Sequence, residues 1–127
     1  MGLRTDHVEE MGRFYSDILC CPLERTLPPD TGLTQLRAGH ALIDIVSVDS
    51  ELGRAGGGPP GATENNLDHF CLQLEDIGQE DLREWLESNG VETGSFETRY
   101  GAQGFGPSIY ISDPDGNTIE LRSRTDS

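Results

Sequence analysis

Apolar residues recur at helical spacing in two segments of the chain, residues 8–19 and residues 77–88. An aspartate stands where each helix would begin, Asp6 for the first and Asp76 for the second, and Gly90 follows the second segment as a stop signal. These patterns predict two amphipathic helices with the aspartates as N-caps. The apolar stripes comprise Val8, Met11, Tyr15, Ile18 and Leu19 in the first helix, and Leu82, Trp85 and Leu86 in the second.

Short runs with strand character surround the two helices, so that each predicted helix is followed by three predicted strands. Trp85 is expected to pack against strand residues such as Phe70 or Leu121. The same order of elements in both halves indicates a repeated unit. The predicted strands span residues 23–27, 33–37, 41–47, 68–74, 91–98, 108–112 and 117–122.

A segment rich in glycine and proline, residues 53–62, separates the two halves. It cannot hold a regular element and is predicted to be an exposed connector. It divides one domain of 127 residues into module one, about residues 1–52, a linker, about 53–66, and module two, about 67–124.

The two modules match along the sequence. The predicted caps Asp6 and Asp76 are 70 residues apart, whereas Asp44 and Glu120, each between two apolar residues, are 76 residues apart. We interpret this match as an internal duplication. A longer loop in module two, residues 101–107, accounts for the difference in spacing.

Composition narrows the classes of partner. The formal net charge is −14 and all nine basic residues are arginines, so nucleic acids and anionic membranes would be repelled. No run approaches the roughly 20 apolar residues that span a bilayer. The first residues lack the apolar core of a signal peptide, so a cytoplasmic location is expected. The three cysteines make a poor disulfide framework and are expected to be reduced.

Three segments carry a resemblance to a known family: FYSDIL at residues 14–19, LDHF at residues 67–70 and SIYISDPDGNTIE at residues 108–120. The chain resembles the vicinal-oxygen-chelate superfamily of glyoxalases, bleomycin resistance proteins and extradiol dioxygenases, especially its glyoxalase-domain members. The resemblance implies an α+β fold in which two βαβββ modules form an open, cup-like mixed β-barrel with the helices outside. It covers nearly the whole chain, with the first strand truncated. It also implies a homodimer.

Strand alternation within the implied cup selects candidate metal ligands. In the strand that opens module two, the apolar residues would face the helix, which turns His69 and Cys71 into the cup. The same alternation turns Asp44 and Glu120 inward. The resemblance therefore implies His69, Glu120 and Asp44 as metal ligands, with Glu120 and Asp44 also as the catalytic carboxylates.

An imidazole and carboxylates that leave open positions for a substrate suit zinc, nickel, manganese, magnesium or iron. The ion would hold two vicinal oxygens of the substrate while a carboxylate moves a proton. A lone histidine on a strand is more often a structural residue, so the ligand role of His69 depends on the resemblance. The corresponding position of module one falls ahead of Met1, where the family has its first ligand. We therefore expect an incomplete site in which the metal is bound weakly or is absent.

The glycine-rich segment 99–107 has neither the spacing nor the lysine of a phosphate-binding loop. It is predicted to be either a rim of the cup, where Arg99 or Tyr100 contacts the substrate, or a plain loop. Cys71 is a third candidate for substrate contact, although packing is the commoner role of such a residue.

Three functions stay open at this point. The first is a metal-dependent, glyoxalase-like lyase or isomerase that acts on a small oxygenated substrate. The second is an extradiol-type dioxygenase, which would need redox-active iron. The third is a metal-free small-molecule binding protein of the bleomycin-resistance kind, whose acidic surface would suit a cationic ligand.

Overall fold

The computed structural model describes residues 1–50, 53, 59, 67–75 and 77–123. The chain divides into two compact units, Met1–Asn66 and Leu67–Ser127, which are described one at a time as module one and module two. Most of the predicted linker lies outside the described residues. No helix among the described residues is long and apolar enough to cross a membrane.

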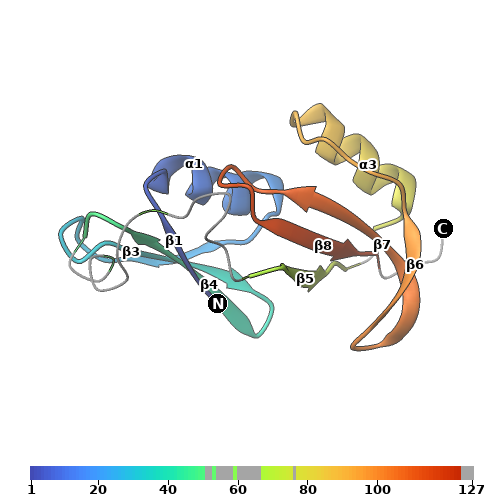
Figure 1. Ribbon diagram of the computed structural model, residues 1–127, viewed down its shortest axis with the longest axis horizontal. Helices are drawn as coiled ribbons and strands as arrows, with labels where there is room; N and C mark the ends of the chain where they lie inside the picture. Colours follow the sequence, from blue (N-terminus) through green and yellow to red (C-terminus); the bar gives the residue numbers. More distant parts are fainter. Residues whose placement is uncertain (51–52, 54–58, 60–66, 76, 124–127) are drawn as a thin grey trace. The chain divides into compact units, whose positions relative to one another are not determined.

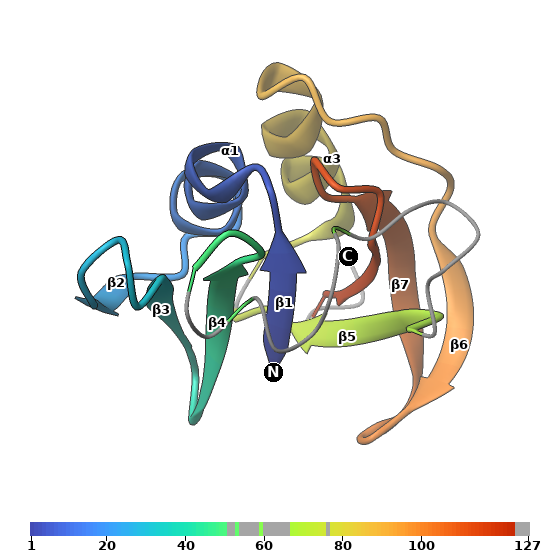
Figure 2. The same cartoon turned by 60° about the vertical axis from the view of Figure 1, so that its left-hand side comes forward.

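Module one is a four-stranded mixed sheet with one helical segment (Figure 1). Its strand order is β1-β4-β3-β2; β1 runs parallel to β4, and the other neighbours are antiparallel (Figure 2). The sheet is open, because it ends in the separate strands β1 and β2. The elements are β1 (Gly2–Thr5), α1 (Val8–Arg13), a π-helical turn η1 (Phe14–Ile18), β2 (Leu23–Thr26), β3 (Leu33–Ala38) and β4 (Ala41–Ser47).

Module two repeats this arrangement with the strand order β5-β8-β7-β6 and the same pattern of one parallel and two antiparallel pairs. Two βαβββ modules of α+β type are thus confirmed. The first strand is the shorter of the two opening strands, with four residues against five in β5. The elements are β5 (His69–Gln73), α3 (Gln79–Ser88), β6 (Glu97–Gly101), β7 (Gly104–Ser112) and β8 (Thr118–Arg122).

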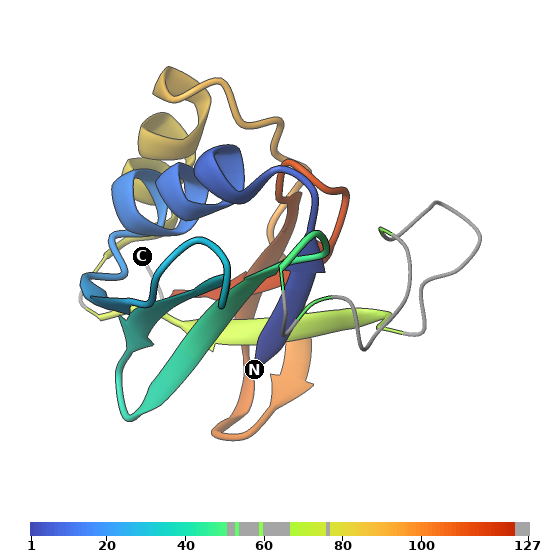
Figure 3. The same ribbon diagram turned by 90° about the vertical axis from the view of Figure 1, so that its left-hand side faces the viewer.

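Each module buries the apolar face of its sheet under its helix (Figures 1 and 3). Alternating strand residues supply this core, as the sequence period predicts. The opposite face of the sheet in module two is therefore left to the polar residues of the same strands. The buried apolar residues include Leu3, Met11, Tyr15, Leu36, Ile43 and Ile45 in module one, and Phe70, Leu82, Leu86, Ile109, Ile111, Ile119 and Leu121 in module two.

The predicted N-caps are wrong, although α1 begins at Val8 as predicted. The N-cap of α1 is His7 rather than Asp6, and no side chain caps the helix; the backbone N–H of His7 donates to Oγ1 of Thr5 instead. The second helix begins after Gly78, again without a side-chain cap, and Asp76 lies outside the described residues. Local sequence spacing identified the helices but not their N-cap residues.

The glycine-rich segment is not a loop. Residues 97–101 and 104–112 pair as the antiparallel hairpin β6–β7, in which Gly101 lies opposite Gly104. Gly104, which directly follows the turn residues 102 and 103, adopts a φ of +90°, which glycine tolerates without strain and which is typical of the residue after a type I turn in a hairpin. The predicted strand 91–98 is correspondingly wrong over most of its length, because β6 begins only at Glu97.

Trp85 is more exposed than the leucines of its apolar stripe, and its predicted packing against Phe70 or Leu121 stays a prediction. It is 42% exposed, whereas Leu82 and Leu86 are buried. The two leucines are four residues apart and form the centre of the apolar stripe, so Trp85 falls at its edge.

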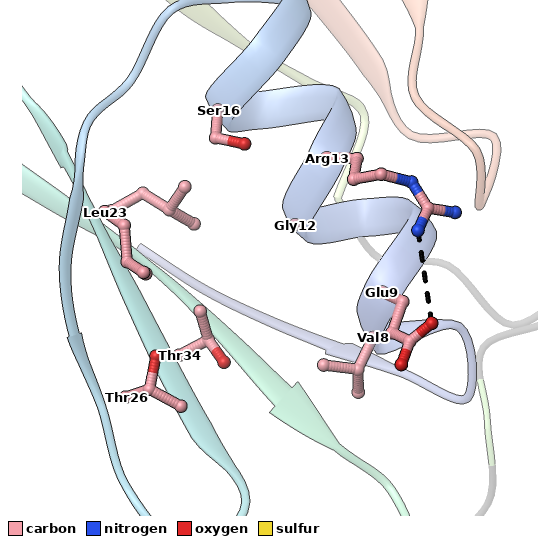
Figure 4. Close-up of a pocket in the computed structure, with 9 residues that line it drawn as sticks. Val8, Glu9, Gly12, Arg13, Ser16, Leu23, Thr26 and Thr34 are labelled. Carbon is pink, nitrogen blue, oxygen red and sulfur yellow. Dashed lines mark ion pairs between the residues drawn. The ribbon is translucent and has the colours of Figure 1, made fainter.

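A hollow of about 300 Å³ lies on the helix side of module one (Figure 4). The ion pair Glu9–Arg13 flanks it on α1. Its lining contains none of the predicted site residues, so the hollow is separate from them. The lining residues are Val8, Glu9, Gly12, Arg13, Ser16, Leu23, Thr26, Thr34 and Leu36.

Replacing Gly90 should test the helix stop. Gly90 has a φ of +77°, and the amides of Gly90 and Val91 bond back to Glu87 and Leu86 as in a Schellman motif. Gly90→Ala should lower the free energy of unfolding by about 1–2 kcal/mol, because an L-residue is strained there. Urea unfolding measures this change.

Gly94→Ala is the matched control, because Gly94 also has open space around it but no positive φ. Equal losses in the two variants would contradict the helix-stop interpretation.

Candidate functional site

The polar face of module two is the side of its sheet formed by every second residue of β5, β7 and β8. Parallel pairing sets Cys71 opposite Glu120, and antiparallel pairing sets Tyr110 opposite Glu120 on the other side. Paired residues share one face of a sheet, so these side chains gather together. The members of this face are His69, Cys71, Gln73, Ser108, Tyr110, Ser112, Thr118, Glu120 and Arg122.

His69 and Glu120 meet on this face. Nε2 of His69 lies 3.4 Å from Oε1 of Glu120, whose side chain is only 8% exposed. The other ring nitrogen, Nδ1, lies 2.7 Å from the carboxylate of the exposed Asp68. A proton on Nδ1 that is donated to Asp68 leaves the lone pair on Nε2, which faces Glu120.

This geometry fits a divalent ion. Two ligand atoms bonded to zinc at about 2.0–2.1 Å with a tetrahedral angle stand roughly 3.3 Å apart, close to the separation of Nε2 and Oε1. The Asp68–His69 pair is the carboxylate support that metal-binding histidines usually have. Among the described residues of either module taken alone, however, no three such ligand atoms lie within 4.8 Å of one another. His69 and Glu120 therefore offer two ligand atoms, and an ion bound to them would need at least one more.

The second oxygen of Glu120 faces an arginine. Oε2 lies 3.7 Å from Nη1 of Arg122, and both side chains are buried. A buried carboxylate requires such a partner, because removing it from water without compensation is costly. Glu120 is thus held between an imidazole on one oxygen and a guanidinium on the other.

Tyr110 and Arg122 also belong to this face, although the sequence pattern assigned no role to either. The ring of Tyr110 meets that of His69 edge to face, with centroids 5.4 Å apart, and the Arg99 guanidinium stacks 4.2 Å from the Tyr110 centroid. Strand alternation places both on this face, because Tyr110 is two residues from Ser108 and Ser112, and Arg122 is two residues from Glu120.

Arg99 and Tyr100, both predicted to contact substrate, lie on opposite faces of β6. Arg99 reaches the polar face, where Nη1 donates to the carbonyl and hydroxyl oxygens of Ser108. Tyr100 is 75% exposed and packs edge to face against Phe105, its partner across the hairpin. The structure thus brings Arg99, but not Tyr100, to the polar face that carries His69.

Cys71 shares the polar face with Glu120. Burial, and after it the negative charge of Glu120, raises the pKa of the Cys71 thiol, while Arg122 acts in the opposite sense. A raised pKa keeps the sulfur protonated at neutral pH and makes it a poor nucleophile. The candidate role of Cys71 in substrate contact stays a prediction.

Asp44, the predicted third ligand or base, belongs to module one. Its Oδ1 accepts a hydrogen bond of 3.0 Å from Nε2 of Gln35. Asp44 lies opposite Gly2 in the parallel pair β1–β4, as Glu120 lies opposite Cys71. By this register the module-one equivalent of His69 falls one position ahead of Met1. The role of Asp44 as a ligand stays a prediction.

Residues 1–121 match the family model of the Glyoxalase/Bleomycin resistance protein/Dioxygenase superfamily. No match to a curated protein was found.

Several solved structures share the fold. An integron cassette protein from the mobile metagenome of V. cholerae is 24% identical with a TM-score of 0.75, covering 98% of this chain and 91% of that chain. A genomically encoded fosfomycin resistance protein from Listeria monocytogenes is 20% identical with a TM-score of 0.69, covering 98% and 90%. A lactoylglutathione lyase from Agrobacterium tumefaciens is 22% identical with a TM-score of 0.64, again covering 98% and 90%. At these identities the likeness shows the fold alone.

The proximity of Cys71 to Glu120 predicts a charge-dependent reactivity. Only the thiolate reacts with iodoacetamide, so the modification of Cys71 should reach half its maximal rate at a pH above that of an ordinary cysteine. Glu120→Gln removes one of the two causes of the raised pKa, so this midpoint should fall. Mass spectrometry of the peptide that contains Cys71 measures it.

Glu97→Gln is the matched control, because Glu97 belongs to the same sheet but pairs with Arg99. A midpoint that is unchanged in Glu120→Gln, or lowered equally by both variants, would refute the electrostatic coupling.

Proposed function

Because the chain belongs to the glyoxalase/bleomycin resistance protein/dioxygenase superfamily, we propose that it is a metal-dependent enzyme, a glyoxalase-like lyase or isomerase that acts on a small oxygenated substrate. One observation carries this proposal: Nε2 of His69 and Oε1 of Glu120 stand 3.4 Å apart, with the other histidine nitrogen already bonded to Asp68. Two donors at ligand spacing on one polar face favour a shared cation over a purely structural contact.

When bound, a divalent ion would supply Lewis-acid chemistry by holding two neighbouring oxygens of the substrate. His69 and Glu120 would hold the ion. A nitrogen together with carboxylate oxygens suits zinc, nickel, manganese or iron better than magnesium, which prefers oxygen alone. Asp44 is proposed to complete the ligand set or to act as the base.

The other residues of the polar face prepare the site for such a substrate. Asp68 fixes the tautomer of His69, and Tyr110 limits the tilt of the imidazole ring by packing against it. Arg122 neutralises one oxygen of Glu120, which lowers the cost of keeping the carboxylate ionised in a buried position. Tyr110 also gives the face an apolar surface on which the carbon skeleton of a substrate can rest.

A metal-free binding protein is the second candidate, and the small number of metal-ligating atoms that converge within each module favours it. Within either described module alone, three ligand atoms do not converge, so ion binding depends on a further donor. In that case His69 and Glu120 would hydrogen-bond a ligand directly, and a net charge of −14 would suit a cation. An extradiol-type dioxygenase differs from the leading proposal by needing iron, so the identity of the bound metal separates the two.

We also propose that the protein is a homodimer. The strands β1 and β5 each lie at the end of their own sheet, and an end strand is a template for pairing with another strand. Members of a family whose modules combine into one site commonly use a twofold axis for this purpose.

Metal uptake by the apo protein tests the proposed centre. With cobalt or zinc, isothermal titration should show binding to the wild-type chain, and His69→Ala should abolish it, because the remaining carboxylates hold transition metals poorly. Glu120→Gln should also weaken binding strongly.

His40→Ala is the control, because His40 is an exposed residue at the turn between β3 and β4. Undiminished binding in His69→Ala would contradict the centre. A wild-type chain that binds no metal would instead support the metal-free binding protein.

Light scattering tests the dimer. A twofold assembly should give about twice the 13.9 kDa mass of one chain at micromolar concentration. A single species at 13.9 kDa would contradict the proposed dimer.

A further inference from the structure

The side chain of Arg122 joins the end of β8 to the β6–β7 hairpin. Nη1 donates to the carbonyl oxygen of Arg99 at 3.1 Å, and Nη2 donates to that of Gly104 at 2.9 Å. The same Nη1 lies 3.7 Å from Oε2 of Glu120. One planar guanidinium thus contacts both strands of the hairpin and the carboxylate that faces His69.

The hairpin leaves room for this guanidinium by using glycine. A Cβ atom on Gly101 would lie 2.6 Å from Nη1 of Arg122, and a Cβ atom on Gly106 would lie 2.8 Å from Nη2. Any side chain at these positions would force the guanidinium to move. The glycines that made residues 99–107 look like a loop are therefore the positions at which the backbone approaches Arg122.

Two further contacts tie the hairpin to the polar face. Nε2 of Gln73 in β5 donates to Oε1 of Gln103 in the hairpin turn at 3.1 Å. Within the hairpin, Arg99 of β6 stacks on Tyr110 of β7, and Tyr110 packs against His69 of β5. The hairpin is thus connected to the two proposed metal ligands of module two, to Glu120 through Arg122 and to His69 through Tyr110.

We propose that Arg122 is a positioning residue that locks the β6–β7 hairpin to Glu120. A displacement of the hairpin would then also displace the Glu120 carboxylate. A buried guanidinium must keep its hydrogen bonds, because no water replaces them. If the hairpin moves away from β8, the Arg122 guanidinium loses its two carbonyl acceptors. If Arg122 then changes position, Glu120 loses its ion-pair partner. The part that concerns the metal rests on the proposed function, whereas the locking of the hairpin does not.

Hydrogen exchange of the apo protein measures the lock directly. Arg122→Met keeps a side chain of similar length but removes the donors Nη1 and Nη2. The amides of residues 97–106 should then exchange about tenfold faster or more. Arg122→Lys keeps the charge but not the planar fork that reaches two carbonyls at once, so it should not restore slow exchange. Arg37→Met is the control, because it removes an arginine paired with a glutamate, Glu24, from module one.

Gly106→Ala tests the same lock with Arg122 still present. The added Cβ should push Nη2 away from the Gly104 carbonyl and speed hairpin exchange in the same residues. Gly94→Ala, which meets no neighbouring atom, is its control. This variant keeps the proposal testable if the Arg122 substitutions prevent folding.

Cobalt binding reports on Glu120. The visible absorption of bound cobalt depends on the number and geometry of its ligands, so a freed carboxylate should change the spectrum. Loss of a residue that orients a ligand should weaken cobalt binding by about 10- to 100-fold in Arg122→Met and Gly106→Ala, but not in the two controls.

Unchanged hairpin exchange in both Arg122→Met and Gly106→Ala would overturn the lock, whatever the cobalt data show. A lysine variant with wild-type exchange and a wild-type cobalt spectrum would also overturn it, because charge alone would then suffice. Faster hairpin exchange with unaltered cobalt binding would refute the link to Glu120. If the wild-type chain bound no cobalt, the proposed function would fail and hairpin exchange alone would decide the role of Arg122.

Discussion

The parallel pairing of β5 with β8 is the constraint on which the candidate site depends. Its register sets Cys71 opposite Glu120 and His69 opposite Thr118. The imidazole and the carboxylate therefore lie on one face of the sheet, at positions offset by two residues along the strands. A slip of one residue would exchange that face for the apolar one and separate His69 from Glu120. The register is held by the core, because Phe70 must lie opposite Ile119 on the side that the helix covers.

The period of the sequence predicted the features that depend on simple alternation. Two helices, the repeated order of strands, and the shared face of His69 and Glu120 all follow from spacing of 3.6 or 2 residues. The N-cap residues could not be predicted in this way, because aspartate is only a statistical preference at a helix start and other backbone conformations can take its place. Spacing also does not show how far each residue of a stripe is buried: Trp85, at the edge of its stripe, is 42% exposed, whereas Leu82 and Leu86 are buried.

The β6–β7 hairpin was missed for a different reason. Glycine-rich segments favour loops by intrinsic preference, yet here tertiary contacts decide the outcome, since a buried guanidinium occupies the space that side chains would need. A sequence shows the glycines and the arginine but not that they are neighbours, because Gly106 and Arg122 are separated by β7 and a turn. The Arg122 contacts to Glu120 and the hairpin therefore become visible only in three dimensions.

The surroundings of Glu120 support the proposal that this face binds a cation. Its buried carboxylate has a fixed positive partner on one side, Arg122, whose donors also serve two backbone carbonyls. On the other side its partner among the described residues is His69, which is uncharged when Nε2 carries the lone pair. The negative charge of Glu120 thus has a permanent positive partner at Oε2, which faces Arg122. At Oε1 it has a positive partner only when His69 is protonated or an ion is bound. Either a proton on His69 or an ion shared with it meets that need, and the hydrogen bond from His69 to Asp68 stabilises both of these states.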